Sequence, residues 1–221
     1  MKGRFWLRRI LIIDGHEVVR EGLKRILEEQ TGPTVVGEAS SSLEALKLVR
    51  EREWDAAVLD FSLDGRGGLE VLKELKRIRS EMPVLVFTTY SEAHYARRAF
   101  KAGAAGYITK NSPRGELVKA INKVIAGGRY VSAALAETLS ADLARDTDRP
   151  PHETLSDREL EVLRWIGLGR TVGEIASVLS LSGKTVSTYR ARLLEKMGLQ
   201  TSAQLIHYAI RNKLVDALDE V

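Results

Sequence analysis

The chain has 221 residues and a mass of 24.5 kDa, which is the size of two ordinary domains rather than one. Hydrophobic residues make up 44% and charged residues 29%, a balance that is typical of soluble globular proteins and excludes a disordered chain. The net charge is +4, but the positive excess lies mainly before residue 131, so charge alone does not identify a nucleic-acid-binding domain.

What the sequence lacks excludes several kinds of site and location. There is no cysteine, which rules out disulfides, thiolate zinc sites and cysteine nucleophiles, and the four histidines are too scattered to indicate a His-rich metal site. No apolar run approaches the roughly 20 residues that span a bilayer, and charges interrupt the basic N-terminus before a signal-peptide core can form. We therefore expect a cytoplasmic protein that does not associate with membranes.

Short apolar runs alternate with amphipathic segments over the first 127 residues. Uniformly apolar runs of this length are typical of parallel strands that helices cover on both faces. Five repeats of strand and helix predict an α/β fold with a right-handed, doubly wound, five-stranded parallel sheet. The expected strands are Ile10–Ile13, Val35–Val36, Ala56–Leu59, Val84–Phe87 and Gly106–Thr109.

Between the strands, apolar residues recur at helical spacing and predict the faces that pack on the sheet. Pro113 is expected to open the last of these helices, and Gly127 and Gly128 to end it. The predicted stripes are Val18, Gly22, Leu23, Ile26 and Leu27; Leu43, Leu46 and Val49; Leu69, Leu72, Leu75 and Ile78; and Leu117, Ala120, Ile121 and Val124.

Four polar residues, Asp14, Asp60, Thr88 and Lys110, each stand where an apolar run ends. Ligands of open parallel sheets bind at the carboxyl ends of the strands, so we expect these side chains to converge. An aspartate beside a lysine and a hydroxyl can accept a phosphoryl group, with a divalent cation neutralising the crowded oxygens. The pattern favours Asp60 as the nucleophile, with Lys110 and Thr88 gripping the phosphoryl group.

The expected metal site consists of Asp14, Asp60 and the backbone carbonyl of Ser62, and Mg²⁺ is the expected ion. Phosphorylation adds about −1.5 to −2 charges. If this charge draws Thr88 inward, Tyr107 gains the space to rotate, which would convert a local charge into a change at the surface.

Several motifs resemble the receiver domain of two-component response regulators. They are Asp60–Leu63, Gly68, Val84–Thr88 and Lys101–Lys110. The resemblance covers residues 8–127 in order. It implies a flavodoxin-like fold, a partner histidine kinase and a Mg²⁺ requirement. It also implies Asp60 as the phosphoacceptor, Thr88 and Tyr107 as a switch pair, and Lys110 as the lysine that contacts the phosphoryl group.

Two positions depart from the receiver pattern. Gly15 replaces the second of two adjacent acids, which in the family generally contacts the metal, so metal binding is expected to be weakened. Asp64 replaces the usual proline and is interpreted as a turn residue rather than a ligand. An alternative therefore stays open: a regulator of the same fold whose degenerate acidic pocket works independently of phosphorylation.

Two other interpretations of the segment from Asp60 to Gly65 fail on spacing. An EF-hand loop needs glutamate at its twelfth position, where Val71 stands, with Glu70 one residue early. Aspartate-nucleophile phosphatases carry the second acid two residues after the first, whereas here it is four residues on. We expect no turnover of an external substrate, only acceptance of a phosphoryl group by the chain itself.

The composition changes after residue 128. The segment Arg145–His152 is polar, charged and proline-paired, which marks a linker, and Ala133–Leu143 is expected to form one helix. The predicted boundaries are 1–128 for the first domain, 129–153 for the linker and 154–221 for the second domain. Four helices are expected in the second domain: Asp157–Gly167, with Ser156 as N-cap and Glu159 at its third position, Val172–Ser180, Gly183–Met197 and Ser202–Asn212.

The pair Val172–Ser180 and Gly183–Met197 is a helix-turn-helix candidate. Residues 155–215 resemble the LuxR-type helix-turn-helix output domain. The motifs that carry this resemblance are Leu155–Leu163, Gly169, Glu174–Ala176, Leu181–Arg190 and Lys196–Leu199. The whole chain resembles the NarL/FixJ class of response regulators, which implies control of transcription through DNA, a histidine kinase and RNA polymerase as partners.

A helical wheel separates two faces of Gly183–Met197. Val186, Leu193 and Met197 are predicted to be buried, and the opposite side is predicted to face DNA. This helix carries four cations and one anion from Ser182 to Met197, a patch that attracts phosphates. We assign Lys184, Ser187, Thr188 and Ala191 to bases, and Thr185 and Arg192 to phosphates.

Two further expectations concern contacts of this domain. Arg190 lies at the edge of the buried face and either contacts DNA or pairs with Glu159. The helix Ser202–Asn212 carries Leu205, Ile206, Ala209 and Ile210 on one stripe and is predicted to be the dimer helix, because one such module contacts few base pairs and a homodimer on paired half-sites is expected.

Overall fold

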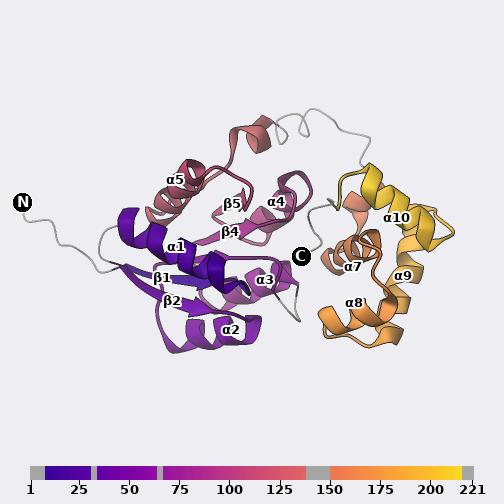
Figure 1. Ribbon diagram of the computed structural model, residues 1–221, viewed down its shortest axis with the longest axis horizontal. Helices are drawn as coiled ribbons and strands as arrows, with labels where there is room; N and C mark the ends of the chain where they lie inside the picture. The colour runs from indigo at the N-terminus through magenta and orange to yellow at the C-terminus, as the bar shows by residue number, and fades with distance from the viewer. Residues whose placement is uncertain (1–7, 31–33, 64–66, 138–149, 216–221) are drawn as a thin grey trace, which may run out of the picture. The chain divides into compact units, whose positions relative to one another are not determined.

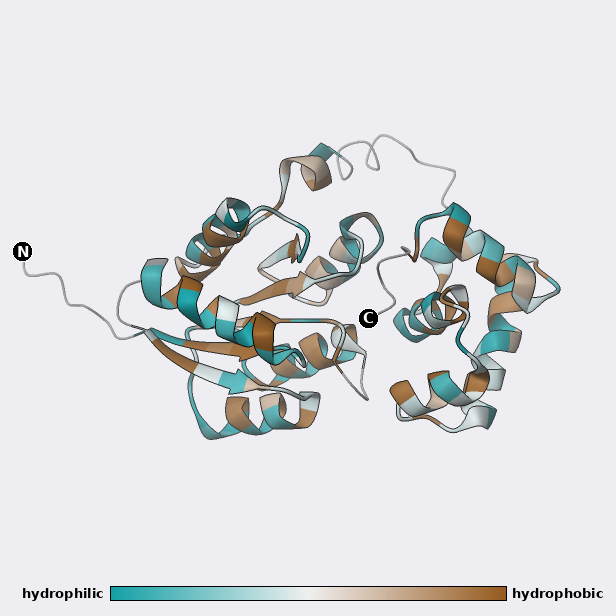
Figure 2. Cartoon of the chain, viewed as in Figure 1, coloured by the Kyte–Doolittle hydropathy of each residue, from teal (hydrophilic) through white to brown (hydrophobic). Residues whose placement is uncertain are grey.

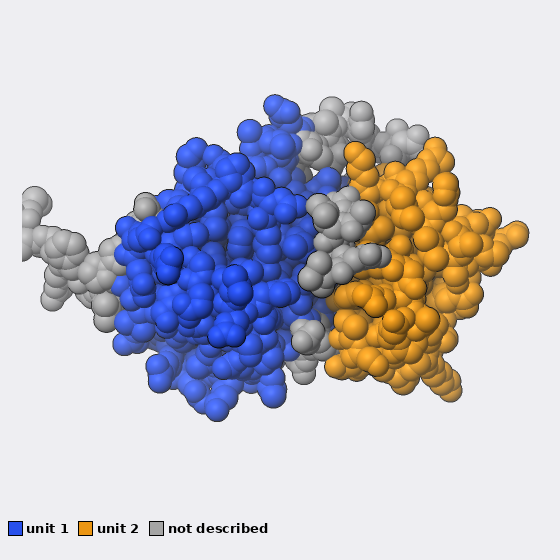
Figure 3. Space-filling view, viewed as in Figure 1, with its two compact units in different colours: residues 1–137 blue, residues 138–221 orange. Residues whose placement is uncertain are grey.

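The computed structural model describes residues 8–30, 34–63, 67–137 and 150–215. The chain divides into two compact units, residues 1–137 and 138–221, which Figure 3 colours separately. The segment 129–137, assigned to the linker from the sequence, belongs to the first unit, because Tyr130 forms a parallel bridge with Gly106 and Leu135 is buried. A helix covers 133–137, and the rest of the expected helix Ala133–Leu143 lies outside the described residues.

The first unit is a five-stranded, all-parallel sheet in the order β2-β1-β3-β4-β5, with helices between successive strands (Figure 1). The doubly wound α/β fold expected from the sequence is therefore confirmed. The strands are β1 (Arg8–Ile13), β2 (Thr34–Ala39), β3 (Ala56–Leu59), β4 (Val84–Thr88) and β5 (Gly106–Thr109). The helices are α1 (Glu17–Gln30), α2 (Ser42–Glu51), α3 (Gly68–Ile78), α4 (Glu92–Lys101) and α5 (Arg114–Ile125).

The core of this unit lies on both faces of the sheet. On one face, Leu23 and Leu27 of α1 and Leu117 and Ile121 of α5 pack over Val58 at the centre of the sheet. Figure 2 shows the resulting pattern, in which the strands are mostly apolar while the helices alternate polar and apolar surfaces. Burying both faces removes the apolar runs from water, and it leaves the strand ends as the places where polar side chains gather.

Three residues expected in the apolar stripes are exposed instead: Val18, Gly22 and Leu43. Val18 is 84% exposed and Leu43 is 77% exposed. Val18 and Leu43 are each the second residue of their helix, and the helix phase turns the buried side toward Leu23 in α1 and toward Ala45 and Leu46 in α2.

The second unit is helical, as expected: η1 (Pro151–Thr154), α7 (Asp157–Gly167), α8 (Val172–Val178), α9 (Gly183–Met197) and α10 (Ser202–Arg211). The 3₁₀ turn η1 lies where the sequence predicted linker. It is held because the buried His152 places Nδ1 2.8 Å from the hydroxyl of Tyr208. Helix α8 ends two residues before its predicted end, because Ser180 adopts a positive φ of 51°. No helix within the described part of the chain is long and apolar enough to cross a membrane.

Candidate functional site

Strand register brings the expected pocket residues to one edge of the sheet. Ile13 of β1 pairs with Leu59 of β3, so the next residues, Asp14 and Asp60, stand side by side, and the Asp60 amide donates to the Ile13 carbonyl at 2.8 Å. Thr88 and Thr109 pair in the same way at the ends of β4 and β5. The amide of Lys110 then donates to the Thr88 carbonyl at 2.8 Å.

Lys110 bridges the two aspartates. Its Nζ lies 2.6 Å from Asp60 Oδ2 and 2.7 Å from Asp14 Oδ2. The two carboxylates are almost fully buried, and the lysine side chain is 12% exposed. Two buried negative charges at this spacing need a nearby cation, and the ammonium supplies it. The pocket is thus an electrostatic unit of two acids and one base.

Backbone amides hold both acids in place. The Ser62 amide donates to Asp60 Oδ1 at 3.1 Å, and the His16 amide donates to Asp14 Oδ1 at 2.8 Å. Ser62, expected to offer its carbonyl to a metal, therefore contacts Asp60 through its N–H group in this structure. Asp64, interpreted as a turn residue, lies outside the described residues.

The expected switch pair meets through a third residue, Tyr90. Thr88 is fully buried, and its hydroxyl oxygen accepts a hydrogen bond from the Tyr90 amide at 3.4 Å. Tyr107 is also fully buried and donates its hydroxyl to the Tyr90 carbonyl at 2.9 Å. Burial, followed by the neighbouring tyrosines Tyr95 and Tyr90, raises the pKa of Tyr107 well above its usual range. The phenol therefore points inward as a neutral donor.

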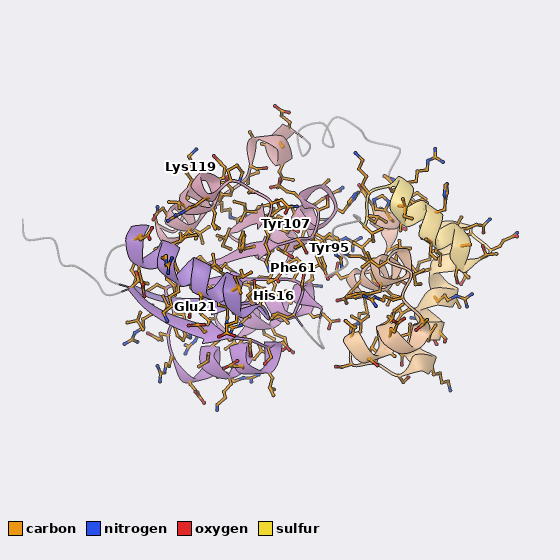
Figure 4. The ribbon with its side chains drawn as sticks, in the orientation of Figure 1. His16, Glu21, Phe61, Tyr95, Tyr107 and Lys119 are labelled. Atoms are coloured by element: carbon orange, nitrogen blue, oxygen red, sulfur yellow. The ribbon has the colours of Figure 1, made fainter. Side chains whose placement is uncertain are left out.

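Aromatic packing connects this pair to the loop after the phosphoacceptor candidate. The ring of Phe61, the residue after Asp60, lies 6.1 Å from that of Tyr107 at 79° and 6.3 Å from that of Tyr90 at 82°. Figure 4 labels Phe61 and Tyr107 at the sheet edge, with His16 near them. The residue that follows Asp60 is therefore in direct contact with the rings of Tyr90 and Tyr107.

Sequence reasoning missed three residues of this pocket. His16 places Nδ1 3.1 Å from Asp14 Oδ1, Arg20 donates from Nη1 to the Asp14 carbonyl at 2.9 Å, and Tyr90 links Thr88 to Tyr107. An aspartate side chain often accepts a hydrogen bond from the backbone amide two residues later, so the sequence could have predicted the contact of His16 with Asp14. Gly68, noted in the sequence, is required for packing because a Cβ there would lie 2.3 Å from Phe61 Cα.

The helix α9 presents two faces, as the wheel predicts. Val186, Leu193 and Met197 are buried, whereas Lys184, Ser187, Thr188, Ala191 and Arg192 are exposed. Thr185 is half-buried, and its hydroxyl lies 2.8 Å from that of Ser182, which also caps the helix by accepting the Thr185 amide at 3.0 Å. The Thr188 hydroxyl donates to the Lys184 carbonyl at 3.0 Å. The exposed side chains thus form a polar, basic surface on one face of the helix.

The pairing of Arg190 with Glu159 is not what the structure contains. Arg190 donates from Nε to the Ser202 hydroxyl at 2.6 Å, and Glu159 instead binds Lys196, with Nζ 2.8 Å from Oε2. The half-buried Arg190 turns toward the start of α10, while Lys196, six residues later on α9, reaches the start of α7. The buried Glu159 is therefore compensated by Lys196 rather than by Arg190.

The apolar stripe of α10 divides between two environments. Leu205 and Ala209 are fully buried, and α10 packs mainly against α7 within the same unit. Ile206 is half-buried, and Ile210 is 58% exposed. Half of the stripe predicted for dimerisation therefore belongs to the core of this unit, and Ile210 is left as its exposed apolar side chain.

A doubly wound sheet with a Lys–Asp–Asp pocket, followed by a helix-turn-helix unit, defines a signalling protein with a DNA-binding output. Residues 10–122 match the response regulator receiver domain family, and residues 153–209 match the family of bacterial regulatory proteins of the luxR family. The response regulator UvrY of Escherichia coli is 36% identical over 209 residues, which cover 94% of this chain and 96% of UvrY. The response regulator GacA of Pseudomonas aeruginosa is 37% identical over 210 residues, which cover 95% and 98%.

Solved structures of response regulators are also similar to this chain, over most or part of its length. RcsB from Salmonella enterica serovar Typhimurium, bound to promoter rprA in the presence of the phosphomimetic BeF3⁻, is 25% identical with a TM-score of 0.68, covering 92% of this chain and 98% of that one. A two-component response regulator of the LuxR family from Aurantimonas sp. is 37% identical with a TM-score of 0.59, covering 63% and 100%. The chain belongs to the response regulators of the NarL/FixJ class, in which a receiver domain is joined to a LuxR-type DNA-binding domain that regulates transcription.

Proposed function

We propose that a histidine kinase transfers a phosphoryl group to Asp60 and that this transfer controls DNA binding by α9. The observation that carries the proposal is the position of Lys110, whose Nζ lies within 2.7 Å of both buried aspartates. A cation in this position neutralises the approach of an anionic phosphoryl donor and then holds the oxygens of the product.

The chemistry asks little of the protein beyond position and charge. An Asp60 carboxylate oxygen attacks phosphorus, the bond from phosphorus to the donor nitrogen breaks, and the donor imidazole leaves with the electron pair. The Ser62 amide keeps Asp60 Oδ1 fixed at 3.1 Å, which favours Oδ2 as the attacking atom. Lys110, already 2.6 Å from Oδ2, stays beside the new acyl phosphate.

A divalent cation fits the donor set of this pocket. Asp14 and Asp60 are buried carboxylates that share a single ammonium, that of Lys110, which lies 2.7 Å from Asp14 Oδ2 and 2.6 Å from Asp60 Oδ2. Asp14 and Asp60 would hold Mg²⁺, with the Ser62 carbonyl as a further oxygen. When bound, the ion would neutralise the phosphoryl oxygens during transfer.

The switch proposal rests on the contacts of Tyr90. A phosphoryl group on Asp60 attracts the Thr88 hydroxyl, which now accepts from the Tyr90 amide. Breaking that contact frees the Tyr90 segment, and with it the carbonyl to which Tyr107 donates. The aromatic cluster and the start of α4 then rearrange together, which offers a route from the pocket to the unit's surface.

We propose that α9 enters the major groove. Lys184, Ser187, Thr188 and the Ala191 methyl would meet base edges, while Thr185 and Arg192 would bind phosphates. The exposure of this face and the burial of Val186 and Leu193 behind it support the assignment. A homodimer on paired half-sites would supply the affinity that one module lacks, with Ile210 of α10 as a candidate contact, and RNA polymerase would be the partner at the promoter.

A labelling experiment tests the phosphoacceptor. The full chain is incubated with acetyl phosphate and Mg²⁺, and its mass is measured intact. Wild type should gain one phosphoryl group and Asp60→Asn none, while Asp55→Asn, a substitution at an exposed aspartate before β3, should label like wild type. Labelling of Asp60→Asn to the wild-type level would refute the acceptor assignment. An unlabelled wild type would favour the alternative of a pocket that works independently of phosphorylation.

A further inference from the structure

The loop between β1 and α1 adds an imidazole to the acidic pocket. His16 Nδ1 lies 3.1 Å from Asp14 Oδ1, and the His16 amide donates to the same oxygen at 2.8 Å. One ligand atom from each of Asp14, His16 and Asp60 can be chosen so that all three lie within 4.8 Å of one another. Figure 4 shows His16 at the same sheet edge as Phe61, which directly follows Asp60. The pocket therefore offers one nitrogen beside its carboxylate oxygens.

These separations suit a single ion. Ligands at neighbouring positions of an octahedron with bonds of about 2.1 Å lie about 3 Å apart, and opposite ligands about 4.2 Å apart. The 3.1 Å between His16 Nδ1 and Asp14 Oδ1 matches neighbouring positions. The upper bound of 4.8 Å on the other separations is close to the distance between opposite ligands, and the 56% exposed ring of His16 has room to adjust its position.

The environment of Asp14 points to a ligand independently of this spacing. Asp14 is 1% exposed, and the described residues place one cation beside its Oδ2, the ammonium of Lys110. Lys110 lies 2.7 Å away but also serves Asp60, so two carboxylates share one ammonium. A buried oxygen in this state gains from a second cation. Gly15 contributes no side chain, which leaves Asp14 and His16 as the ligands of this loop.

The donor set selects among metals by chemistry. Mg²⁺ prefers oxygen ligands and retains its water, whereas imidazole nitrogen suits first-row transition ions such as Fe²⁺, Ni²⁺ and Zn²⁺. We infer that His16, Asp14 and Asp60 form a site for a divalent first-row transition ion, with His16 as a direct ligand that gives this pocket its preference over Mg²⁺. This inference rests on the proposed phosphoacceptor pocket and deepens it by naming the class of its metal.

The test measures metal affinity directly, with Co²⁺ as the probe because its visible absorption reports coordination. The full chain is titrated with Co²⁺ and separately with Mg²⁺ at one fixed, slightly alkaline pH, by calorimetry and, for Co²⁺, by absorption. Transition ions bind most protein sites more tightly than Mg²⁺ does, so the absolute affinities do not decide the question. The decisive quantity is the factor by which each variant lowers the affinity for each ion. His16→Ala should weaken Co²⁺ binding about tenfold or more, change its absorption, and leave Mg²⁺ binding nearly unchanged.

Two further variants separate ligation from structure. His16→Asn keeps a hydrogen-bonding side chain beside Asp14 without an imidazole, and it should lose Co²⁺ affinity as His16→Ala does. His207→Ala removes an exposed histidine of the second unit and should behave as wild type. Equal losses for Co²⁺ and Mg²⁺ in the His16 variants, or no loss for either ion, would overturn the inference.

Restoring an acid should reverse the preference. A Cβ at Gly15 would meet only the Ser40 carbonyl at 3.8 Å, an ordinary contact, so Gly15→Asp fits without strain. We expect this variant to bind Mg²⁺ more tightly than wild type does, and unchanged Mg²⁺ affinity would count against the site. The labelling of Asp60 keeps the two proposals distinct. If wild type is fully phosphorylated with Mg²⁺ and the His16 variants bind both ions as wild type does, the metal inference fails while Asp60 remains the phosphoacceptor. If Asp60→Asn is phosphorylated, Asp60 is not the phosphoacceptor, whatever the metal affinities are.

Discussion

At the scale of single residues, Lys110 is the side chain on which the charge balance of the pocket depends. Its ammonium lies 2.6 Å from one buried carboxylate and 2.7 Å from another, and its own side chain is only 12% exposed. A residue in that position compensates Asp14 and Asp60 in the fold, and under the proposed function it also receives the anionic phosphoryl group. The same contacts therefore predict a stability effect and a chemical effect from one substitution.

Lys110→Ala should destabilise the first unit by about 3 kcal/mol at neutral pH, because two buried carboxylates lose their cation. Lys119→Ala is the matched control, since that side chain is 71% exposed on α5, and its unfolding midpoint should hardly change. Urea unfolding of both variants, followed by circular dichroism, gives the comparison. Similar midpoints for the two variants would mean that Lys110 does not compensate the pocket.

Tyr130 provides a prediction with a pH axis. Burial first, and then the hydrogen bond that its hydroxyl donates to the Glu116 carboxylate at 2.6 Å, raise its pKa from 10.0 to about 12. The stabilisation linked to this phenol is therefore present below pH 10 and is lost as the pH rises through about 12. In an alkaline absorbance titration, the Tyr130→Phe variant should have one tyrosine fewer among those that ionise at the highest pH. Loss of an early-ionising phenol would contradict the assignment.

At the scale of elements, α7 is fixed at its start by a capping box and an interhelical ion pair. The Ser156 hydroxyl accepts from the Glu159 amide, and the Glu159 carboxylate accepts from the Ser156 amide at 2.8 Å and from Lys196 Nζ at 2.8 Å. Burial would raise the pKa of Glu159, but hydrogen bonds from Lys196 and Ser156 outweigh it and hold that pKa below the usual 4.5. Helix start and interhelical contact thus depend on one carboxylate.

Glu159→Gln keeps the capping box and removes only the charge. Because Lys196 is 44% exposed, the expected loss at neutral pH is about 1 kcal/mol or less. A depressed native pKa means that the wild-type advantage is present above pH 4.5 and disappears as the pH falls through the native value. Denaturation at a series of pH values, with Glu195→Gln on the exposed side of α9 as control, measures this. A difference that persists unchanged at low pH would refute the charge explanation.

The exposed face of α9 carries a prediction that separates base from phosphate contacts. Lys184→Ala should cost about 1–3 kcal/mol of binding and relax the preference at one base position. Arg192→Ala should instead weaken all sequences alike and reduce the salt slope by about 1. Arg211→Ala removes one positive charge from an exposed side chain of α10 and controls for the change in net charge. Both α9 variants are compared on DNA selected from a random pool, and a loss that is independent of sequence for Lys184→Ala would reverse its assignment.

The sequence predicted the strands and helices better than it predicted the side-chain contacts between them. Apolar runs that end in Asp14, Asp60, Thr88 and Lys110 were enough to place these residues together, because parallel strands end at one edge. A helical wheel gives direction only to within a side chain's reach, so it left Arg190 open between DNA and Glu159, whereas Arg190 contacts Ser202 and Lys196 binds Glu159.

Turns and helix starts depend on local geometry that periodicity does not contain. His16 folds back on Asp14 within a turn, and the exposed Val18 lies in the first turn of α1, so neither position followed from the apolar pattern.

At the scale of the whole molecule, the chain joins a receiver domain to a LuxR-type DNA-binding domain. The first unit has its reactive groups at one sheet edge, and the second carries its basic surface on α9. If phosphorylation of Asp60 controls DNA binding, the two properties must be coupled energetically, and such couplings usually change affinity by about five- to 150-fold.

DNA affinity with and without phosphodonor measures this coupling. The full-length protein first selects fragments from a random DNA pool, and its affinity for a selected duplex is then measured at fixed salt with and without acetyl phosphate and a divalent cation. We expect the affinity of wild type to rise about fivefold or more on treatment, while Asp60→Asn stays at the untreated value. An equal response in Asp60→Asn, or no response in a wild type that mass measurement shows to be phosphorylated, would contradict control of DNA binding through Asp60.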